Sequence, residues 1–132
     1  MMELEATTVI FLLLIHFLAD FGLQTHDQAI NKSTSNLWLF YHVGVYSIVW
    51  LIAMYSFTDI FIESLVFTII TFICHFGTDY ITSRISKKFF AKDDYHNGFV
   101  VVGFDQLLHA IQLIYTYIIL DNYFFYYDLF AN

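Results

Sequence analysis

The chain of 132 residues is 59% hydrophobic and only 13% charged, contains no proline, and has a mean hydropathy of +0.65. A soluble domain usually carries about a quarter charged residues, and a domain of this size has too little interior to bury so many large apolar side chains. A formal charge of −7 with only five Lys and Arg argues against nucleic-acid binding, because phosphate recognition needs basic patches. The composition therefore excludes soluble and disordered classes and predicts a helical membrane protein.

Four apolar segments are long enough to cross a bilayer, which takes about 20 helical residues. They run over about residues 7–24, 37–57, 60–83 and 99–120. A tight turn around residues 56–59 joins the second segment to the third, and no Gly/Ser-rich or Pro-rich linker divides the chain. We therefore expect an all-α, integral membrane four-helix bundle of two helical hairpins, formed by a single transmembrane domain over residues 1–132.

The basic residues predict the orientation of this bundle. All five Lys and Arg lie in two polar connections, residues 25–36 and 84–98, which fall on the same side of a four-span bundle. The positive-inside rule makes these connections cytoplasmic and leaves both termini on the non-cytoplasmic side. Glu3 and Glu5 precede the first apolar segment without any basic residue, so we expect a retained helix rather than a secretory signal.

Histidine and aspartate recur four residues apart inside the predicted spans. The pairs are His16 with Asp20, His75 with Asp79, and Asp105 with His109, and the second span adds His42. The order reverses in the last span, which runs in the opposite direction, so each Asp lies nearer the cytoplasm than its His. With a rise of 1.5 Å per residue, the Asp side chains lie roughly 6–9 Å inside the helix ends. The sequence thus predicts one polar layer within one half of the bilayer.

These residue types are ligands of divalent metal ions. Imidazole nitrogen and carboxylate oxygen bind zinc or manganese at about 2.0–2.2 Å, and i,i+4 spacing lets two side chains of a helix reach one ion. We therefore expect one or two ions, zinc or manganese, and a metal-polarised water that hydrolyses a bond. The expected ligands and their orienting partners are His16, Asp20, His42, His75, Asp79, Asp105 and His109.

Three further residues border the polar layer and are candidates for substrate contacts. Gln24 ends the first span, Tyr46 follows His42 by four residues, and Arg84 begins the basic connection. Basic segments at the cytoplasmic surface attract anionic headgroups. The expected partners are therefore the lipid bilayer and a lipid or phosphorylated amphiphile.

Other interpretations of the polar layer stay open at this point. A His–Asp layer relays protons or ions in transporters, and polar residues also hold helices together at roughly 0.6 kcal/mol per hydrogen bond, as in a partner-binding assembly factor. Opposed histidines at equal depth ligate b-type haem, but haem does not explain the accompanying Asp residues. The outer half of the spans is almost entirely apolar, which argues against a path across the bilayer.

A short internal repeat relates the two predicted hairpins. The pattern His-Phe-x-x-Asp-aromatic occupies residues 16–21 and again residues 75–80, and each copy is followed by a helix with a further histidine. Two equivalent hairpins of this kind are typical of membrane proteins built by duplication.

The chain resembles a family of small bacterial and phage membrane proteins, domain of unknown function 3307. The segments that carry the resemblance are HFLADFGLQT (16–25), NKS (31–33), HVGVY (42–46), HFGTDYITSR (75–84) and FDQLLH (104–109). The resemblance implies a compact helical protein in the inner, cytoplasmic membrane of a bacterium or phage-infected cell. It also implies a basic residue near the position that Thr82 occupies here. A more distant likeness, to integral-membrane metal-dependent hydrolases, rests on His and Asp residues at similar depth.

Overall fold

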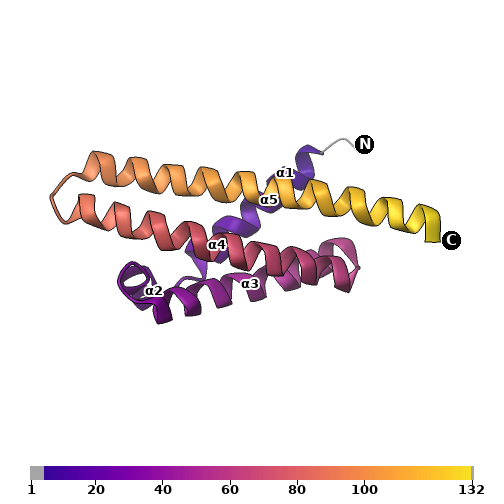
Figure 1. The fold of residues 1–132 in the computed structure, drawn as a ribbon, viewed down its shortest axis with the longest axis horizontal. Helices are drawn as coiled ribbons and strands as arrows, with labels where there is room; N and C mark the ends of the chain where they lie inside the picture. The colour runs from indigo at the N-terminus through magenta and orange to yellow at the C-terminus, as the bar shows by residue number, and fades with distance from the viewer. Residues whose placement is uncertain (1–4, 132) are drawn as a thin grey trace.

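Three long helices form the framework of the molecule in the computed structural model, which describes the backbone of residues 5–131 and the side chains of residues 5–124 (Figure 1). The helix α4 packs against both α3 and α5. The predicted all-α class is confirmed. In chain order the elements are α1 (Ala6–Phe17), the π-helical turn η1 (Leu18–Gly22), α2 (His26–Asn31), α3 (Asn36–Thr58), α4 (Phe61–Phe90) and α5 (Tyr95–Ala131).

The long helices are apolar enough to cross a membrane. Among the described residues, α3, α4 and the Tyr95–Phe124 part of α5 meet this criterion, whereas the apolar helix Ala6–Gly22 is shorter. Large apolar side chains point outward from these helices, and Ile73 and Phe99 are 65% and 66% exposed. Such a surface is unfavourable in water but matches hydrocarbon chains. The three helices therefore indicate an integral membrane protein.

Two helices extend beyond the apolar segments that the sequence predicts. α4 runs to Phe90 rather than ending near residue 83, and α5 begins at Tyr95 rather than near residue 99. The basic segment between them is thus helical apart from residues 91–94. Hydropathy marks where lipid ends rather than where a helix ends, and Arg and Lys are good helix formers in water. A helix of 30 residues is about 45 Å long, so α4 exceeds the bilayer core of about 30 Å.

The other polar connection, residues 25–36, contains the short helix α2, which the sequence did not predict. The Thr25 hydroxyl accepts from the Gln28 amide at 3.3 Å, and the Gln28 side chain accepts from the Thr25 amide at 2.8 Å. This reciprocal capping box satisfies two amides at the start of α2. Ser35 then caps α3 through the Trp38 amide at 3.5 Å. Local side-chain capping therefore fixes the segment that carries Lys32.

The bundle has an apolar half and a polar half. Near the α3–α4 turn, the core is mainly apolar and contains side chains with 0% exposure from Leu12, Trp50, Met54, Phe67 and Leu113, with Glu63, Ser64 and Thr68 also buried there. The histidines and aspartates occupy the other half, toward the end of the molecule that holds α2 and the α4–α5 connection (left in Figure 1). The two predicted basic connections therefore lie toward the same end of the molecule.

The predicted turn at residues 56–59 is confirmed, and it depends on one residue in the left-handed region. Asp59 ends α3 with φ 57° and ψ 9°. Asp tolerates this conformation better than most residues, whereas a β-branched side chain clashes with its own backbone there.

We expect Asp59→Gly to retain or raise the stability by up to about 1 kcal/mol and Asp59→Val to lower it by about 1–2 kcal/mol. Thermal unfolding in detergent micelles measures both effects, with Asp59→Ala as an intermediate variant. Equal stability of the Val and Gly variants would contradict this account of the turn.

Candidate metal centre

Four segments of the chain deliver buried histidines and aspartates to one cluster. Asp20 comes from η1, His42 from α3, and Asp105 and His109 from α5, while α4 contributes His75 and Asp79. Each of these side chains is at most 9% exposed. The helical i,i+4 spacing that the sequence displays therefore does place His and Asp on inward-facing stripes.

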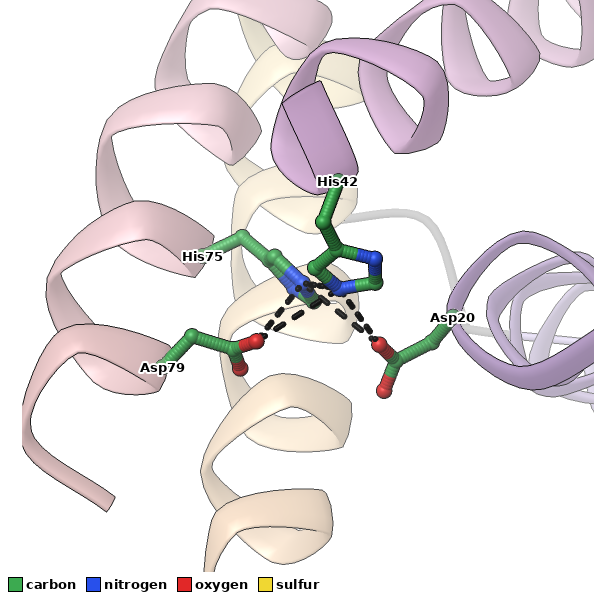
Figure 2. A group of neighbouring side chains, drawn as sticks. All are labelled: Asp20, His42, His75 and Asp79. Carbon is green, nitrogen blue, oxygen red and sulfur yellow. Dashed lines mark hydrogen bonds and ion pairs between the residues drawn. The ribbon is translucent and has the colours of Figure 1, made fainter. Parts of the chain in front are cut away.

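Four of these side chains direct one ligand atom each toward a common centre (Figure 2). His42 Nε2 lies 3.0 Å from Asp20 Oδ1 and 3.4 Å from Asp79 Oδ2. His75 Nε2 lies 3.6 Å and 3.7 Å from the same two oxygens. The two Nε2 atoms are 3.2 Å apart. Four ligand atoms are enough for a four-coordinate metal site.

These separations match the edges of a tetrahedral metal site. Metal–ligand bonds of about 2.0–2.1 Å produce ligand–ligand edges of about 3.3–3.4 Å in a regular tetrahedron. The five distances among Asp20, His42, His75 and Asp79 run from 3.0 to 3.7 Å. Two His and two Asp are also a ligand set suited to zinc or manganese. The four side chains thus fit a divalent ion with little rearrangement.

The bonding of Asp20 supports the same interpretation. Its Oδ1 atom is buried and accepts no well-aligned hydrogen bond among the described residues, and its polar neighbours include His42 Nε2 at 3.0 Å and the Lys32 ammonium at 3.8 Å. A buried carboxylate oxygen without a well-aligned donor costs about 1–3 kcal/mol. A cation at the centre of the cluster would remove that cost.

Ring packing on both sides orients His75, in addition to the contact of its Nε2 atom with His42. Tyr46 stacks on one side with its ring centroid 3.9 Å away, and the His109 ring stacks at 4.1 Å. The other ring nitrogen of His75, Nδ1, has no hydrogen-bond partner among the described residues. Tyr46, predicted as a substrate contact, is itself fully buried in this stack.

The π-helical turn η1 sets the position of Asp20. The Leu23 amide donates to the Leu18 carbonyl at 2.8 Å, an i→i+5 bond that widens the helix at this point. Both Ala19 and Asp20 are buried as a result. π-turns occur often at functional sites, because they redirect a side chain that a regular helix would present elsewhere.

A chain of hydrogen bonds links His16 to the carboxylates. The Gln106 amide nitrogen donates to Asp20 Oδ2 and to Asp105 Oδ2, both at 3.0 Å. Its carbonyl oxygen therefore faces His16 Nε2 at 2.9 Å, which makes that nitrogen the donor. His16 Nδ1 is then the acceptor for the Tyr46 hydroxyl at 2.9 Å. His16 thus orients Gln106 and lies outside both groups of atoms that could share an ion.

Lys32 supplies a positive charge directly beside the cluster. Its ammonium lies 2.8 Å from Asp79 Oδ2, 3.8 Å from Asp20 Oδ1 and 3.3 Å from His42 Nε2. Burial opposes the charged form, but the carboxylates of Asp79 and Asp20 outweigh it and raise the pKa of Lys32 above its usual 10.5. Lys32 is therefore an ammonium at every physiological pH.

A second group of ligand atoms adjoins the first. It comprises one atom each from Asp20, Asp105 and His109, all within 4.8 Å of one another. His109 Nε2 lies 3.5 Å from Asp105 Oδ2. The Thr82 hydroxyl donates a very short hydrogen bond to Asp105 Oδ1 and so fixes the other oxygen of that carboxylate.

The cluster opens into a cavity of about 160 Å³ on the side of α2. Gln24 lines this cavity beyond the end of η1, and its amide donates to the Asp20 carbonyl at 3.0 Å. Arg84 lies elsewhere: it donates to Asn36 Oδ1 at 2.7 Å and packs over the Tyr80 ring at 3.8 Å. Among the predicted substrate contacts, Gln24 is thus the one that reaches the cavity.

Three residues of the site were missed by the sequence reasoning. No site role is predicted from the sequence for Lys32 or Gln106, and Thr82 is named only as a position where the resemblance implies a basic residue. The sequence did carry a signal for two of them, because Lys32 lies within the NKS segment and Gln106 within FDQLLH. Lys32 also brings to the cluster the positive charge that the resemblance implies near Thr82.

The three long apolar helices indicate an integral membrane protein, and its polar half contains a buried histidine–aspartate cluster. The chain belongs to the family described as Protein of unknown function (DUF3307), which matches residues 8–129. No curated protein and no solved structure matches the chain.

We expect Lys32→Met to destabilise the metal-free protein, because it leaves two buried carboxylates, Asp20 and Asp79, without their ammonium partner. Removing one member of a buried ion pair costs about 3–5 kcal/mol. Since the pKa of Lys32 is raised, its contribution is fully present below pH 10.5 and is lost only as the pH rises through the higher folded-state value. The deficit should therefore stay constant between about pH 6 and pH 9.

Thermal unfolding in micelles with a chelator measures this deficit. Lys88→Met is the matched control, because Lys88 is exposed on the same basic end of the molecule. A Lys32 variant as stable as the Lys88 variant would show that the ammonium does not hold the cluster together.

Proposed function

We propose that this protein is a membrane-embedded, metal-dependent hydrolase that acts at the cytoplasmic face on a phosphorylated amphiphile. The observation that carries the proposal is the convergence of four buried ligand atoms within 4.8 Å of one another, with five of their six separations between 3.0 and 3.7 Å. Single hydrogen-bonded pairs have similar lengths, but a metal tetrahedron needs four ligand atoms that meet at one point. Intramembrane ionisable groups are also functional far more often than incidental, because they are costly to insert.

The charge of the cluster supports a divalent ion. Asp20, Asp79 and Asp105 contribute three negative charges when ionised, and Lys32 contributes one positive charge. The remaining charge of −2 is what a single zinc or manganese ion neutralises. In an apolar bundle this neutrality is worth several kcal/mol, because an uncompensated charge is poorly solvated there.

When bound, such an ion supplies Lewis acidity and a water that ionises near neutral pH. The residues of this chain do the remaining work. Asp20, Asp79 and His42 would bind the ion. The Gln106 amide donates to the carboxylates of Asp20 and Asp105 and so keeps both in position. Lys32, at the cavity wall, is available to bind an anionic group of a substrate.

The surroundings of the cavity favour an amphiphile as the substrate. A second, apolar groove runs along α4 and α5 on the lipid-facing side, and its walls include Ile81, Phe104 and Leu108. Thr82 lines both the groove and the polar cavity. A headgroup in the cavity and an acyl chain in the groove would therefore belong to one molecule that enters from the bilayer. The inner membrane of a bacterium is the location we propose.

A second function is favoured by the position of Lys32. Its ammonium already neutralises part of the carboxylate charge, so the layer is also consistent with a metal-free assembly factor or a proton relay. The apolar core of Trp50, Met54 and Phe67 argues against a relay that crosses the bilayer. A haem is less consistent still, because the Nε2 atoms of His42 and His75 lie 3.2 Å apart with carboxylate oxygens beside them, which leaves no room for a macrocycle between the two histidines.

We expect the purified protein to contain zinc or manganese, and the His75→Ala and Asp79→Asn variants to lose at least tenfold in metal content at equal folding. Elemental analysis of protein purified in micelles measures the metal, and circular dichroism reports the folding. The wild type should also hydrolyse a phosphomonoester or phosphodiester amphiphile in mixed micelles, and chelation should abolish this activity.

His96→Ala is the matched control, since His96 is an exposed histidine at the start of α5 and should leave metal and activity unchanged. Wild-type protein that binds neither metal under saturating conditions would overturn the proposal. A proton flux across proteoliposomes, with the polar layer required and metal dispensable, would establish the second function instead.

A further inference from the structure

We propose that the cluster is binuclear, with a second metal ion held by Asp105 and His109 and bridged to the first through Asp20 and Asp79. This inference rests on the proposed metal-dependent function and deepens it. The two residues that belong to the second site alone, Asp105 and His109, lie on α5, whereas His42 and His75 lie on α3 and α4.

The two oxygens of Asp79 face different histidines. Its Oδ2 atom lies 3.4 Å and 3.7 Å from the Nε2 atoms of His42 and His75. Its Oδ1 atom lies 3.1 Å from His109 Nε2. A carboxylate that offers one oxygen to each of two ligand sets has the geometry of a bridging ligand in two-metal sites, where the ions are about 3.5–4 Å apart.

The two oxygens of Asp20 also face different sides of the cluster. Its Oδ1 atom lies 3.0 Å from His42 Nε2, whereas its Oδ2 atom faces the α5 side and accepts from Gln106 at 3.0 Å. Asp20 is the residue that both groups of potential ligands share. Each carboxylate oxygen has two lone pairs, so a hydrogen bond from Gln106 leaves one lone pair for an ion.

The rest of the second site is built in the same way. His109 is 1% exposed and Asp105 is 9% exposed. The Thr82 hydroxyl holds Asp105 Oδ1, while Asp105 Oδ2 accepts from the Gln106 amide at 3.0 Å and lies 3.5 Å from His109 Nε2, with a second lone pair for an ion. The four ligands of this site are therefore Asp20, Asp79, Asp105 and His109.

The charge of a binuclear centre fits the proposed substrate. Three carboxylates, the Lys32 ammonium and two divalent ions sum to +2, and a bound phosphate dianion restores the neutrality that the buried cluster needs. A positive centre at the wall of a cavity binds a phosphate group, and two ions together stabilise the attacking and leaving oxygens of a phosphoryl displacement. The second ion therefore selects phosphoesters over neutral acyl esters.

Metal titration of the full chain in lipid nanodiscs tests the inference. We expect two Mn²⁺ per chain by equilibrium dialysis with elemental analysis, and an electron paramagnetic resonance spectrum of an exchange-coupled pair. His109→Ala should bind one Mn²⁺ and show the spectrum of an isolated ion, while His96→Ala should bind two.

The outcomes separate this inference from the proposed function. One Mn²⁺ per wild-type chain with an uncoupled spectrum would overturn the binuclear centre and leave the mononuclear site standing. No bound metal would overturn both. If His109→Ala fails to fold, Asp105→Asn tests the same site, and retention of a coupled pair in that variant would assign the second ion to other ligands.

Discussion

The burial of three carboxylates inside an apolar helical bundle is the constraint on which the rest of the polar half depends. Each ionised group loses its hydration and must be compensated by charge or by hydrogen bonds. Lys32 approaches Asp79 and Asp20, Gln106 donates to two carboxylates at once, and Thr82 donates to the third. Even with these partners, Asp20 keeps one oxygen without a well-aligned hydrogen bond. The polar contacts within the cluster therefore do not fully compensate the carboxylates, and a further cation would complete the compensation.

The separation of the bundle into two halves follows from the same constraint. The apolar half packs Trp50, Met54 and Phe67 without exposure and holds the helices in register. That register places side chains from α3, α4 and α5 at one level, which no single helix achieves. The polar half can then open through a cavity beside α2 without admitting water to the other half. Packing in one half thus supplies the precision that ligand geometry needs in the other.

The sequence predicted the helical class and the convergence of His and Asp because both depend on helical periodicity. The pairs His75–Asp79 and Asp105–His109 share a face by spacing alone. Helix ends escaped prediction, because α4 continues through Lys87 and Lys88 where hydropathy falls but helix propensity does not. Gln106 escaped as well, since its turn toward Asp20 depends on how α1 and η1 approach α5. Lys32 depends on the capped segment that folds α2 back onto the bundle. These contacts are tertiary, and no local pattern encodes them.

The π-turn of η1 changes what the internal repeat means. In α4 the motif remains a regular helix, and its histidine, His75, faces the ligand atoms. In the first copy the extra residue of the turn redirects Asp20 into the cluster, while His16 is left to hydrogen-bond Tyr46 and Gln106. The two copies of the motif have therefore diverged in role. The copy in α4 supplies both its histidine and its aspartate to the ligand group, whereas the first copy supplies Asp20 alone and uses His16 to align Gln106.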